Sequence, residues 1–307
     1  MQEIKIFCPA TIANLSCGFD VMGVALDTIG DEMTVRKIAE RKVEITKITG
    51  QDLPKEINKN VAGVAASAFL KKAKYCGGFE IEIHKKIKPG SGIGSSAASS
   101  AGVVWAMNEL LNRPFSKKEL VEFAMQGERL ASNVAHADNV APVIFGGFVL
   151  VRSYAPLDIV QLPTPKALYA VILHPQIEIK TADSRKILKS RIALEEGVKQ
   201  WGNLGGLVAG LFKEDYELIG RSLEDHIIEP TRSILIPGFE EVKKKSLDAG
   251  ALGCGISGSG PSIFALCQGI EMAQNVAGAM QKVYDKIGID FEVHVSKLNA
   301  KGAKKLK

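Results

Sequence analysis

The chain has 307 residues, of which 46% are hydrophobic and 24% are charged, so it can bury a core and is not expected to be disordered. This length fits two domains of ~100–200 residues or one large domain. The formal net charge is +5, and the five lysines of residues 297–307 account for all of it: without them, 34 basic side chains balance 34 acidic ones. A nucleic-acid-binding protein with a basic groove is therefore not expected.

Other classes of protein are excluded by similar arguments. No apolar run approaches the ~18 residues that a membrane-spanning helix needs, so we expect no membrane partner. The N-terminus has no signal-peptide pattern, and the five cysteines include no C-x-x-C pair. Both observations predict a protein of the reducing cytoplasm. The basic tail at 297–307 could touch RNA or acidic lipid, but we expect a solvated end.

In the first half of the chain, strands alternate with helices. Alternating apolar residues predict half-buried strands at 42–49 and 79–85, with an amphipathic helix at 59–74 between them. A glycine-rich loop at 88–94 precedes a helix that runs to about Leu111. A further helix begins at Ser116, where the S-x-x-E pattern predicts a capping box, and residues 145–153 form a strand.

Three prolines in residues 153–165 predict a domain junction, so we expect domains at 1–155 and 156–307. The second half begins with a strand at 167–173. The remaining elements are expected as follows: helices around 182–195, 197–212, 214–228 and 238–249, strands at 250–257 and 262–267, a helix at 270–287 and a strand at 291–296. This alternation is too irregular for a doubly wound sheet and favours the α+β class.

Residues 86–102, KIKPGSGIGSSAASSAG, contain the most informative motif. Glycines at 90, 92 and 94 let the backbone curl around an anion, and the following helix adds the positive end of its dipole. The hydroxyl groups of Ser95 and Ser96 can bind phosphate or a metal ion. The pattern is neither a Walker A loop nor a dinucleotide-binding fingerprint. The alternative is a structural turn that caps the helix.

A second glycine-rich loop, GCGISGSGPS, occupies residues 253–262 between two predicted strands. By itself it is equally consistent with a hairpin turn that binds nothing. Together with the first loop it could form the second wall of a nucleotide site.

The helix that starts at Ser116 has an apolar stripe that includes Leu120, Ala124 and Leu130. Glu128 falls on the same face, where a carboxylate is costly unless it is paired or binds metal. One interpretation is an oxygen ligand for Mg²⁺, with Ser96 as the natural second ligand. The other is a buried ion pair or a side chain at the edge of the stripe.

The polar residues of HADNVAP, at 136–142, precede an apolar segment. His136, Asp138 and Asn139 could orient a substrate hydroxyl, or they could simply cap a helix and form a loop.

Three segments, in this order, resemble the motifs of the GHMP kinase superfamily: PATIANLSCGFD at 9–20, PGSGIGSSAASS at 89–100 and GISGSGPS at 255–262. Four further segments resemble the homoserine kinases within it: HADNVAP, FGGF at 145–148, KTADSRKIL at 180–188 and EPTRSILIP at 229–237. The first motif departs from the family pattern at Ile12 and at Ser16-Cys17, which we expect to lie inside a loop.

The resemblance implies a two-domain fold, with an N-terminal domain like the second domain of ribosomal protein S5 and a ferredoxin-like C-terminal domain. It implies that ATP, with Mg²⁺, phosphorylates the side-chain hydroxyl of L-homoserine. It also implies a homodimer. A mevalonate or sugar kinase of the same fold is the nearest rival, but such acceptors have no amine to bind. A non-catalytic relative would be expected to lack Ser96 or Glu128, and both are present.

The family's site residues carry over by position. Ser96 and Glu128 match the metal ligands, Arg185 and Arg232 match positions that bind the substrate carboxylate, and Asn14 and Asp20 match positions that bind its amine. His136 and Asn139 match positions near the substrate. We assign Asp138 and Asn139 as catalytic, with Asp138 as the candidate proton acceptor, although members of the family are thought to lack a clear base. The implied ATP contacts are Asn60, Val61, Pro89, Gly90, Ser91, Gly92, Ile93, Gly94, Ser95, Ser96, Ala97, Ser99, Gly258, Ser259 and Gly260.

Overall fold

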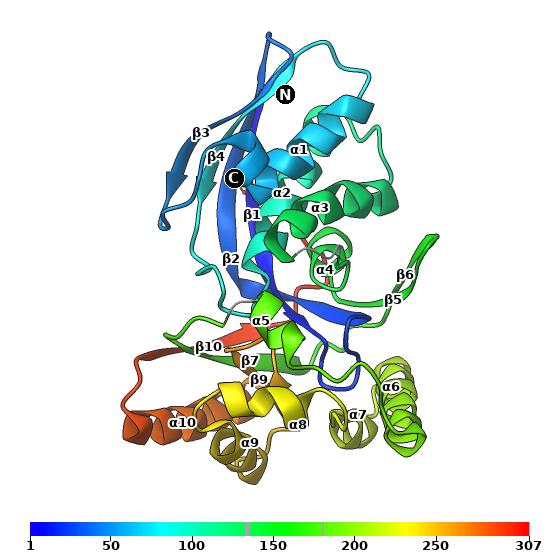
Figure 1. Cartoon of the computed structure of the whole chain (residues 1–307), viewed down its shortest axis with the longest axis vertical. Helices are drawn as coiled ribbons and strands as arrows, with labels where there is room; N and C mark the ends of the chain where they lie inside the picture. The colour runs from blue at the N-terminus through cyan, green and yellow to red at the C-terminus, as the bar shows by residue number, and fades with distance from the viewer. Residues whose placement is uncertain (133–135, 180, 307) are drawn as a thin grey trace.

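The computed structural model describes residues 1–132, 136–179 and 181–306. Within these residues the strands form two sheets, one in the upper and one in the lower part of Figure 1. The order of the first sheet is β11 (Lys304–Lys305), β1 (Glu3–Ala13), β2 (Met22–Ile38), β4 (Gly78–His84) and β3 (Val43–Thr49), and the hairpin of β5 (Phe148–Tyr154) and β6 (Leu157–Gln161) adds to β2. The order of the second is β10 (Phe291–Lys297), β7 (Leu168–Pro175), β9 (Ile263–Gln268) and β8 (Gly253–Ile256).

Four helices cover one face of the first sheet (Figure 1): α1 (Val61–Lys72), α2 (Ser95–Leu110), α3 (Lys117–Ser132) and α4 (Val140–Phe145). Helix α2 lies in the middle and contacts the other three helices as well as β1. Its small residues permit this close packing, because a Cβ atom on Gly102 would lie 2.3 Å from the Cys8 sulfur. The buried centre of this layer holds the start of α2 in a fixed place.

The second sheet is covered by α9 (Phe239–Asp248) and α10 (Ile270–Ile287), whose buried Phe239, Met280 and Tyr284 belong to its core. The remaining helices are α5 (Thr181–Lys186), α6 (Leu194–Lys213), α7 (Tyr216–Ser222) and α8 (Glu229–Arg232), with 3-10 turns at Ile57–Lys59 and Ser233–Leu235. Helices α6 and α7 pack together at one edge of the molecule (Figure 1). Helices and strands thus alternate irregularly, and the predicted α+β class is confirmed.

Most of the predicted elements are confirmed within a few residues, including α1, α2, α9 and α10. The capping box at the start of α3 is also confirmed, since the Ser116 amide donates to Glu119 over 2.8 Å. Three predictions about the helices are wrong. The helix expected at 182–195 ends at Lys186, the helix expected at 214–228 ends at Ser222, and the exposed side chain of Leu130 lies outside the apolar stripe of α3.

Sequence reasoning also missed four strands, β1, β2, β6 and β11. In β1 and β2, residues 8–13 and 22–26 are buried without alternation, which hides the period of a half-buried strand there. Residues 3–7 and 32–36 do alternate, so this part of the signal was present and was overlooked. Of the residues of the first motif that were expected in a loop, Ile12 is fully buried in β1, which corrects the prediction, whereas Ser16 and Cys17 lie in a turn after the strand, as predicted. Of the other two missed strands, β6 lies in the proline-containing segment and β11 in the lysine-rich C-terminal segment.

The lysine-rich C-terminal segment is not the solvated end that was expected. Asn299 is buried and exchanges backbone hydrogen bonds with Ala25 and Gly147, and β11 pairs with β1. Lys304 also forms an ion pair with Asp27 over 2.9 Å. The predicted domain boundary between 155 and 156 stays a prediction; it falls in the turn between β5 and β6, both in the first sheet.

A buried ion pair fixes the start of α2. The Lys85 ammonium, at the end of β4, contacts the Asp31 carboxylate of β2 and donates to the Ser95 carbonyl over 2.9 Å and the Ser99 hydroxyl over 3.0 Å. The other Asp31 oxygen accepts from the amides of Lys86 and Ile87. Because the side chains of Lys85 and Asp31 are both buried, removing one member of the pair leaves an isolated charge in the interior.

We expect Asp31→Ala to lower the free energy of unfolding by ~3–5 kcal/mol, since Lys85 would remain as a buried charge without its counter-ion. Urea denaturation measures this change. Asp158→Ala, which breaks the exposed pair with Arg152, is the control and should cost less than ~1 kcal/mol. Equal effects of the two substitutions would contradict the assignment.

Candidate active site

A cavity of 510 Å³ lies between the first sheet's helices and the loops of the second half. It collects most of the predicted site residues: Asn14, Asp20, Asn60, Val61, Pro89, Gly90, Ser91, Gly92, Gly94, Ser95, Ser96, Ser99, Glu128, His136, Asp138, Asn139, Arg185, Arg232, Gly258 and Ser259. Segments that are far apart in the sequence therefore share one pocket, which is large enough for a small ligand.

The first glycine loop curls over the beginning of α2. Gly90, Gly92 and Gly94 all have positive φ angles, and Gly94 is the N-cap of the helix. A Cβ atom on Gly94 would lie 2.1 Å from the Thr11 hydroxyl oxygen, so glycine is required here by both space and conformation. The first amides of α2 have no acceptor within the helix and line the cavity, which suits an anionic ligand.

The second glycine loop packs directly on the first. The Ser257 hydroxyl donates to the Gly92 carbonyl over 2.9 Å, and the Ser262 amide donates to the Ser91 carbonyl over 3.2 Å. A Cβ atom on Gly92 would lie 2.6 Å from the Gly260 carbonyl oxygen. The two loops thus form adjoining parts of one wall, and Gly258 and Ser259 reach the cavity.

Glu128 points from α3 toward α2, as predicted from the helix periodicity. The Ser96 hydroxyl donates to Glu128 Oε2 over 2.9 Å, and the Ser100 hydroxyl donates to Oε1 over 3.1 Å. Burial raises the pKa of Glu128 to about 7, and the two hydroxyl donors and nearby Lys85 oppose that shift. A carboxylate and a hydroxyl therefore meet at the start of α2, beside the glycine loop.

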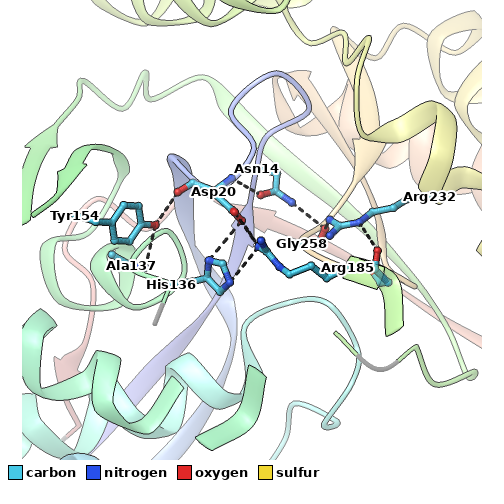
Figure 2. A network of polar contacts seen from close by, with 9 residues as sticks. Asn14, Asp20, His136, Ala137, Tyr154, Arg185, Arg232 and Gly258 are labelled. Carbon is cyan, nitrogen blue, oxygen red and sulfur yellow. Dashed lines mark hydrogen bonds and ion pairs between the residues drawn. The ribbon is translucent and has the colours of Figure 1, made fainter. Parts of the chain in front are cut away.

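A second polar cluster also lines the cavity, and Figure 2 shows it from close by. Arg185 contacts both carboxylate oxygens of Asp20 over 2.8 Å and lies 3.1 Å from His136 Nε2. The side-chain oxygen of Asn14 accepts a hydrogen bond from the Asp20 amide, and its side-chain nitrogen donates to the Gly258 carbonyl over 2.9 Å. Arg232 donates to the same carbonyl over 3.1 Å. Five predicted substrate-binding residues, which come from both halves of the chain, are thus connected.

The two arginines of this cluster lie on one aromatic ring. The guanidinium carbons of Arg185 and Arg232 are 5.3 Å and 5.1 Å from the centroid of Phe19. Burial and the charge of Arg185 lower the pKa of Arg232 to about 10. Two guanidinium groups at short range favour a bound carboxylate, which would supply negative charge beyond that of Asp20.

Comparisons with known proteins agree with this arrangement. Sequence profiles described as "GHMP kinases N terminal domain" and "GHMP kinases C terminal" match residues 59–147 and 207–286. A homoserine kinase of Chloroherpeton thalassium is 48% identical over 94% of this chain and 94% of its own, and one of Chlorobium phaeobacteroides is 46% identical over 99% of each chain. A crystal structure of homoserine kinase from Cytophaga hutchinsonii is 55% identical, with a TM-score of 0.96, and covers 100% of this chain and 98% of that chain.

The chain belongs to the homoserine kinase family. As a GHMP kinase it has the predicted two-domain fold and is an ATP-using enzyme. In the described residues of this kinase, no helix is long and apolar enough to cross a membrane.

The two predicted catalytic residues, Asp138 and Asn139, line the same cavity of the kinase. Asn139 accepts a hydrogen bond from the Thr11 hydroxyl over 2.7 Å. Asp138 is buried, and Oδ1 has no hydrogen-bond partner among the described residues. Burial, then the charges of Asp20 and Glu128, raise the pKa of Asp138 to about 7. This carboxyl group can therefore exchange a proton near neutral pH.

Burial also lowers the pKa of His136, which favours the neutral imidazole. Its Nε2 faces the Arg185 donor, and its Nδ1 lies 3.4 Å from Asp20 Oδ1. These contacts assign the proton to Nδ1, so that Nε2 accepts from Arg185 and Nδ1 donates toward Asp20.

Sequence reasoning missed several residues of the kinase site. Lys85 lines the cavity, as do Leu53, Pro54 and Lys59 near Asn60. The Tyr154 hydroxyl donates to the Asp20 carbonyl over 2.7 Å and accepts from the Ala137 amide (Figure 2). A lysine that directly follows a buried strand was the available signal for Lys85. No comparable signal marks Tyr154, which reaches the site from β5.

Three predicted ATP contacts do not line the cavity with side chains. Ile93 and Ala97 are buried in the core, and Gly260 packs behind Gly92. Their predicted contacts with ATP would be made by backbone atoms, and these contacts stay a prediction.

The raised pKa of Glu128 predicts how the stability of the ligand-free kinase depends on pH. Between about pH 4.5 and 7 the native carboxyl keeps a proton that the unfolded chain has lost, so the free energy of unfolding falls as pH rises. We expect Glu128→Gln to remove ~3 kcal/mol of this decrease. Denaturation from pH 4 to 8 measures it, and a decrease of the same size in both proteins would refute the assignment.

Proposed function

We propose that this kinase transfers the γ-phosphoryl group of ATP directly to the side-chain hydroxyl of L-homoserine and forms O-phospho-L-homoserine. The observation that carries the proposal is the position of the Asp20–Arg185–Arg232 cluster in the same cavity as the glycine loop and the start of α2. An acceptor with both a carboxylate and an amine fits this cluster, whereas mevalonate and sugars offer no amine.

Different residues of the cluster bind different groups of the acceptor. Arg185 and Arg232 bind the carboxylate, for which paired guanidinium groups are well suited. Asn14 and Asp20 accept hydrogen bonds from the amine, and the neutral His136 keeps Asp20 and Arg185 in place. This leaves the acceptor's hydroxyl directed toward Asp138 and Asn139, at the end of the cavity that faces the phosphate loop.

At the other end, the amides of residues 90–97 bind the phosphates of ATP, and Asn60 and Val61 lie beside the adenine with Leu53 and Pro54. Asn60 is well fixed for this purpose, because its side chain accepts from the Ala62 amide and donates to the Pro54 carbonyl.

The residues at the start of α2 fit a magnesium ion. Ser96 and Glu128 present oxygen atoms, the ligand type that Mg²⁺ prefers, and the described residues contain no group of three His, Cys, Asp or Glu that could hold a metal. Such a donor set is sufficient when phosphate oxygens and water complete the coordination. When bound, the ion would neutralise charge on the β- and γ-phosphates.

In the reaction, the homoserine hydroxyl oxygen forms a bond to the γ-phosphorus, and the bond from that phosphorus to its bridging oxygen breaks to release ADP. The hydroxyl proton passes to the Asp138 carboxylate. The pKa of about 7 makes this group a competent acceptor near neutral pH. The chain's main contribution is position and charge neutralisation.

We expect ADP release from MgATP to depend on L-homoserine, and not on L-threonine, L-serine, mevalonate or galactose. Glu128→Ala should reduce the rate by about 100-fold or more, because it removes a metal ligand. The exposed Glu122→Ala on the same helix is the matched control and should leave the rate unchanged. Release with mevalonate or galactose alone would overturn the assignment of the amino-acid cluster, and release without an acceptor would point to another reaction.

The role of Asp138 has its own test. We expect Asp138→Asn to lower kcat by ~10²–10⁴-fold, as for the loss of a general base. In the unmodified kinase kcat should rise with pH through about 7, as the carboxyl loses its proton. A near-normal kcat in the variant would exclude proton transfer to Asp138, even if homoserine remained the acceptor.

A further inference from the structure

The Tyr154 hydroxyl connects two segments of the kinase site. It donates to the Asp20 carbonyl over 2.7 Å and accepts from the Ala137 amide over 3.3 Å. Figure 2 shows this hydroxyl between the two backbone groups, while the Asp20 carboxylate is turned toward Arg185. Tyr154 is not among the described residues that line the cavity. Its influence on a ligand must therefore pass through the residues that it contacts.

The loop that carries Asp20 has a backbone that needs such support. Asn14, Leu15, Ser16 and Asp20 have positive φ angles of 72°, 46°, 59° and 59°. This left-handed conformation is sterically unfavourable for residues other than glycine, although Asn and Asp tolerate it better than most. Residues that adopt it persist where the surrounding structure holds them. The position of Asp20 thus depends on contacts from outside its own loop.

Both backbone groups of Asp20 are held by hydrogen bonds. The amide donates to Asn14 Oδ1 over 3.1 Å, and the carbonyl accepts from Tyr154. The first contact lies within the loop, but the second comes from β5, which pairs with β2. With both groups fixed, the Asp20 carboxylate cannot turn away from Arg185 by rotation of the backbone. Tyr154 thereby anchors this charged residue to the first sheet.

The second contact of the hydroxyl supports the same carboxylate from another segment. The Ala137 amide belongs to the peptide that follows His136, and His136 Nδ1 lies 3.4 Å from Asp20 Oδ1. A phenol has one proton to donate and lone pairs to accept, so both bonds form at once. Partial burial and the charge of Asp138 raise the pKa of Tyr154, so the hydroxyl keeps its proton. One oxygen atom thus fixes the backbone beside two residues whose side chains meet.

The ring of Tyr154 contributes less than its hydroxyl. The residue is 39% exposed, so the burial of apolar surface accounts for only part of its interactions. A phenylalanine would keep the contacts of the ring and lose both hydrogen bonds. The contribution of the hydroxyl can therefore be measured by a single substitution.

We propose that Tyr154 is a positioning residue for the acceptor: its hydroxyl holds the Asp20 loop and the segment that begins at His136 in one relative position, and so sets how tightly the amine is bound. This inference rests on the proposed function, in which Asp20 binds the amine of homoserine. Tyr154 makes no contact with the acceptor itself and acts through Asp20.

Tyr154→Phe tests the proposal by the separation of KM from kcat. We expect the KM for L-homoserine to rise by about tenfold, because two hydrogen bonds that position Asp20 are lost, while kcat and the KM for ATP change by less than about threefold. The matched control is Tyr284→Phe, whose hydroxyl also donates to a backbone carbonyl over 2.7 Å, that of Pro237. The control should leave all three constants unchanged. An unchanged KM for homoserine in Tyr154→Phe, or an equal rise in both KM values, would overturn the proposal.

A double-mutant cycle tests whether the effect passes through Asp20. Asp20→Asn keeps a residue that tolerates the left-handed backbone but removes the negative charge that faces the amine. In this background we expect Tyr154→Phe to raise the KM for homoserine by no more than about twofold, because the group that it positions has lost its function. The same factor in both backgrounds would show that Tyr154 acts independently of Asp20 and would contradict the inference.

Hydrogen exchange in the ligand-free kinase tests the position of the loop without any acceptor. We expect Tyr154→Phe to accelerate amide exchange by tenfold or more in peptides that cover residues 14–21 and 136–140, and to leave residues 90–97 unchanged. Unchanged exchange in both segments, or equal acceleration throughout the chain, would overturn the proposal. Because no acceptor is present, this result stands apart from the proposed function, which fails if the unmodified kinase does not phosphorylate homoserine.

Discussion

The buried ammonium group of Lys85 connects three parts of the first half at a single point. It joins the end of β4 to Asp31 of β2 and to the first turn of α2, and each of these contacts is shielded from solvent. Because an unpaired charge at this place would be costly, the strands and the helix hold one relative position. The position of α2 in turn fixes the glycine loop that precedes it and Ser96, the second residue of the helix.

The cavity separates two kinds of recognition. In the proposed function, backbone amides and a helix terminus face the phosphates, and Lys59 and Lys85 also belong to the lining of the cavity. At the acceptor end, recognition depends on discrete charges: Asp20 against Arg185, with Arg232 close by on Phe19. The Gly258 carbonyl connects the ends, since it accepts from both Asn14 and Arg232, while its loop packs on the phosphate loop. Movement of one loop would therefore disturb both sites.

Local sequence signals predicted the elements and groups whose physical cause is local. Glycines with positive φ, the Ser116 capping box and the helical position of Glu128 all depend on nearby residues. Parts of β1 and β2 could not be found in this way, because burial on both faces hides the period at residues 8–13 and 22–26. The contacts of Lys85 with Asp31 and of Tyr154 with Asp20 join residues 54 and 134 positions apart. Such partners are chosen by the tertiary fold, so the sequence indicated candidate residues without showing how they meet.

The return of the C-terminal segment to the first sheet has a consequence for the order of folding during synthesis. Ile6 pairs with Lys305, and Gly147 and Ala25 receive their backbone partners from Asn299. The edge of the first sheet thus stays open while nearly the whole chain is translated, and contacts of such long sequence separation form late. The first half therefore obtains its last backbone partners only after the second half has been made.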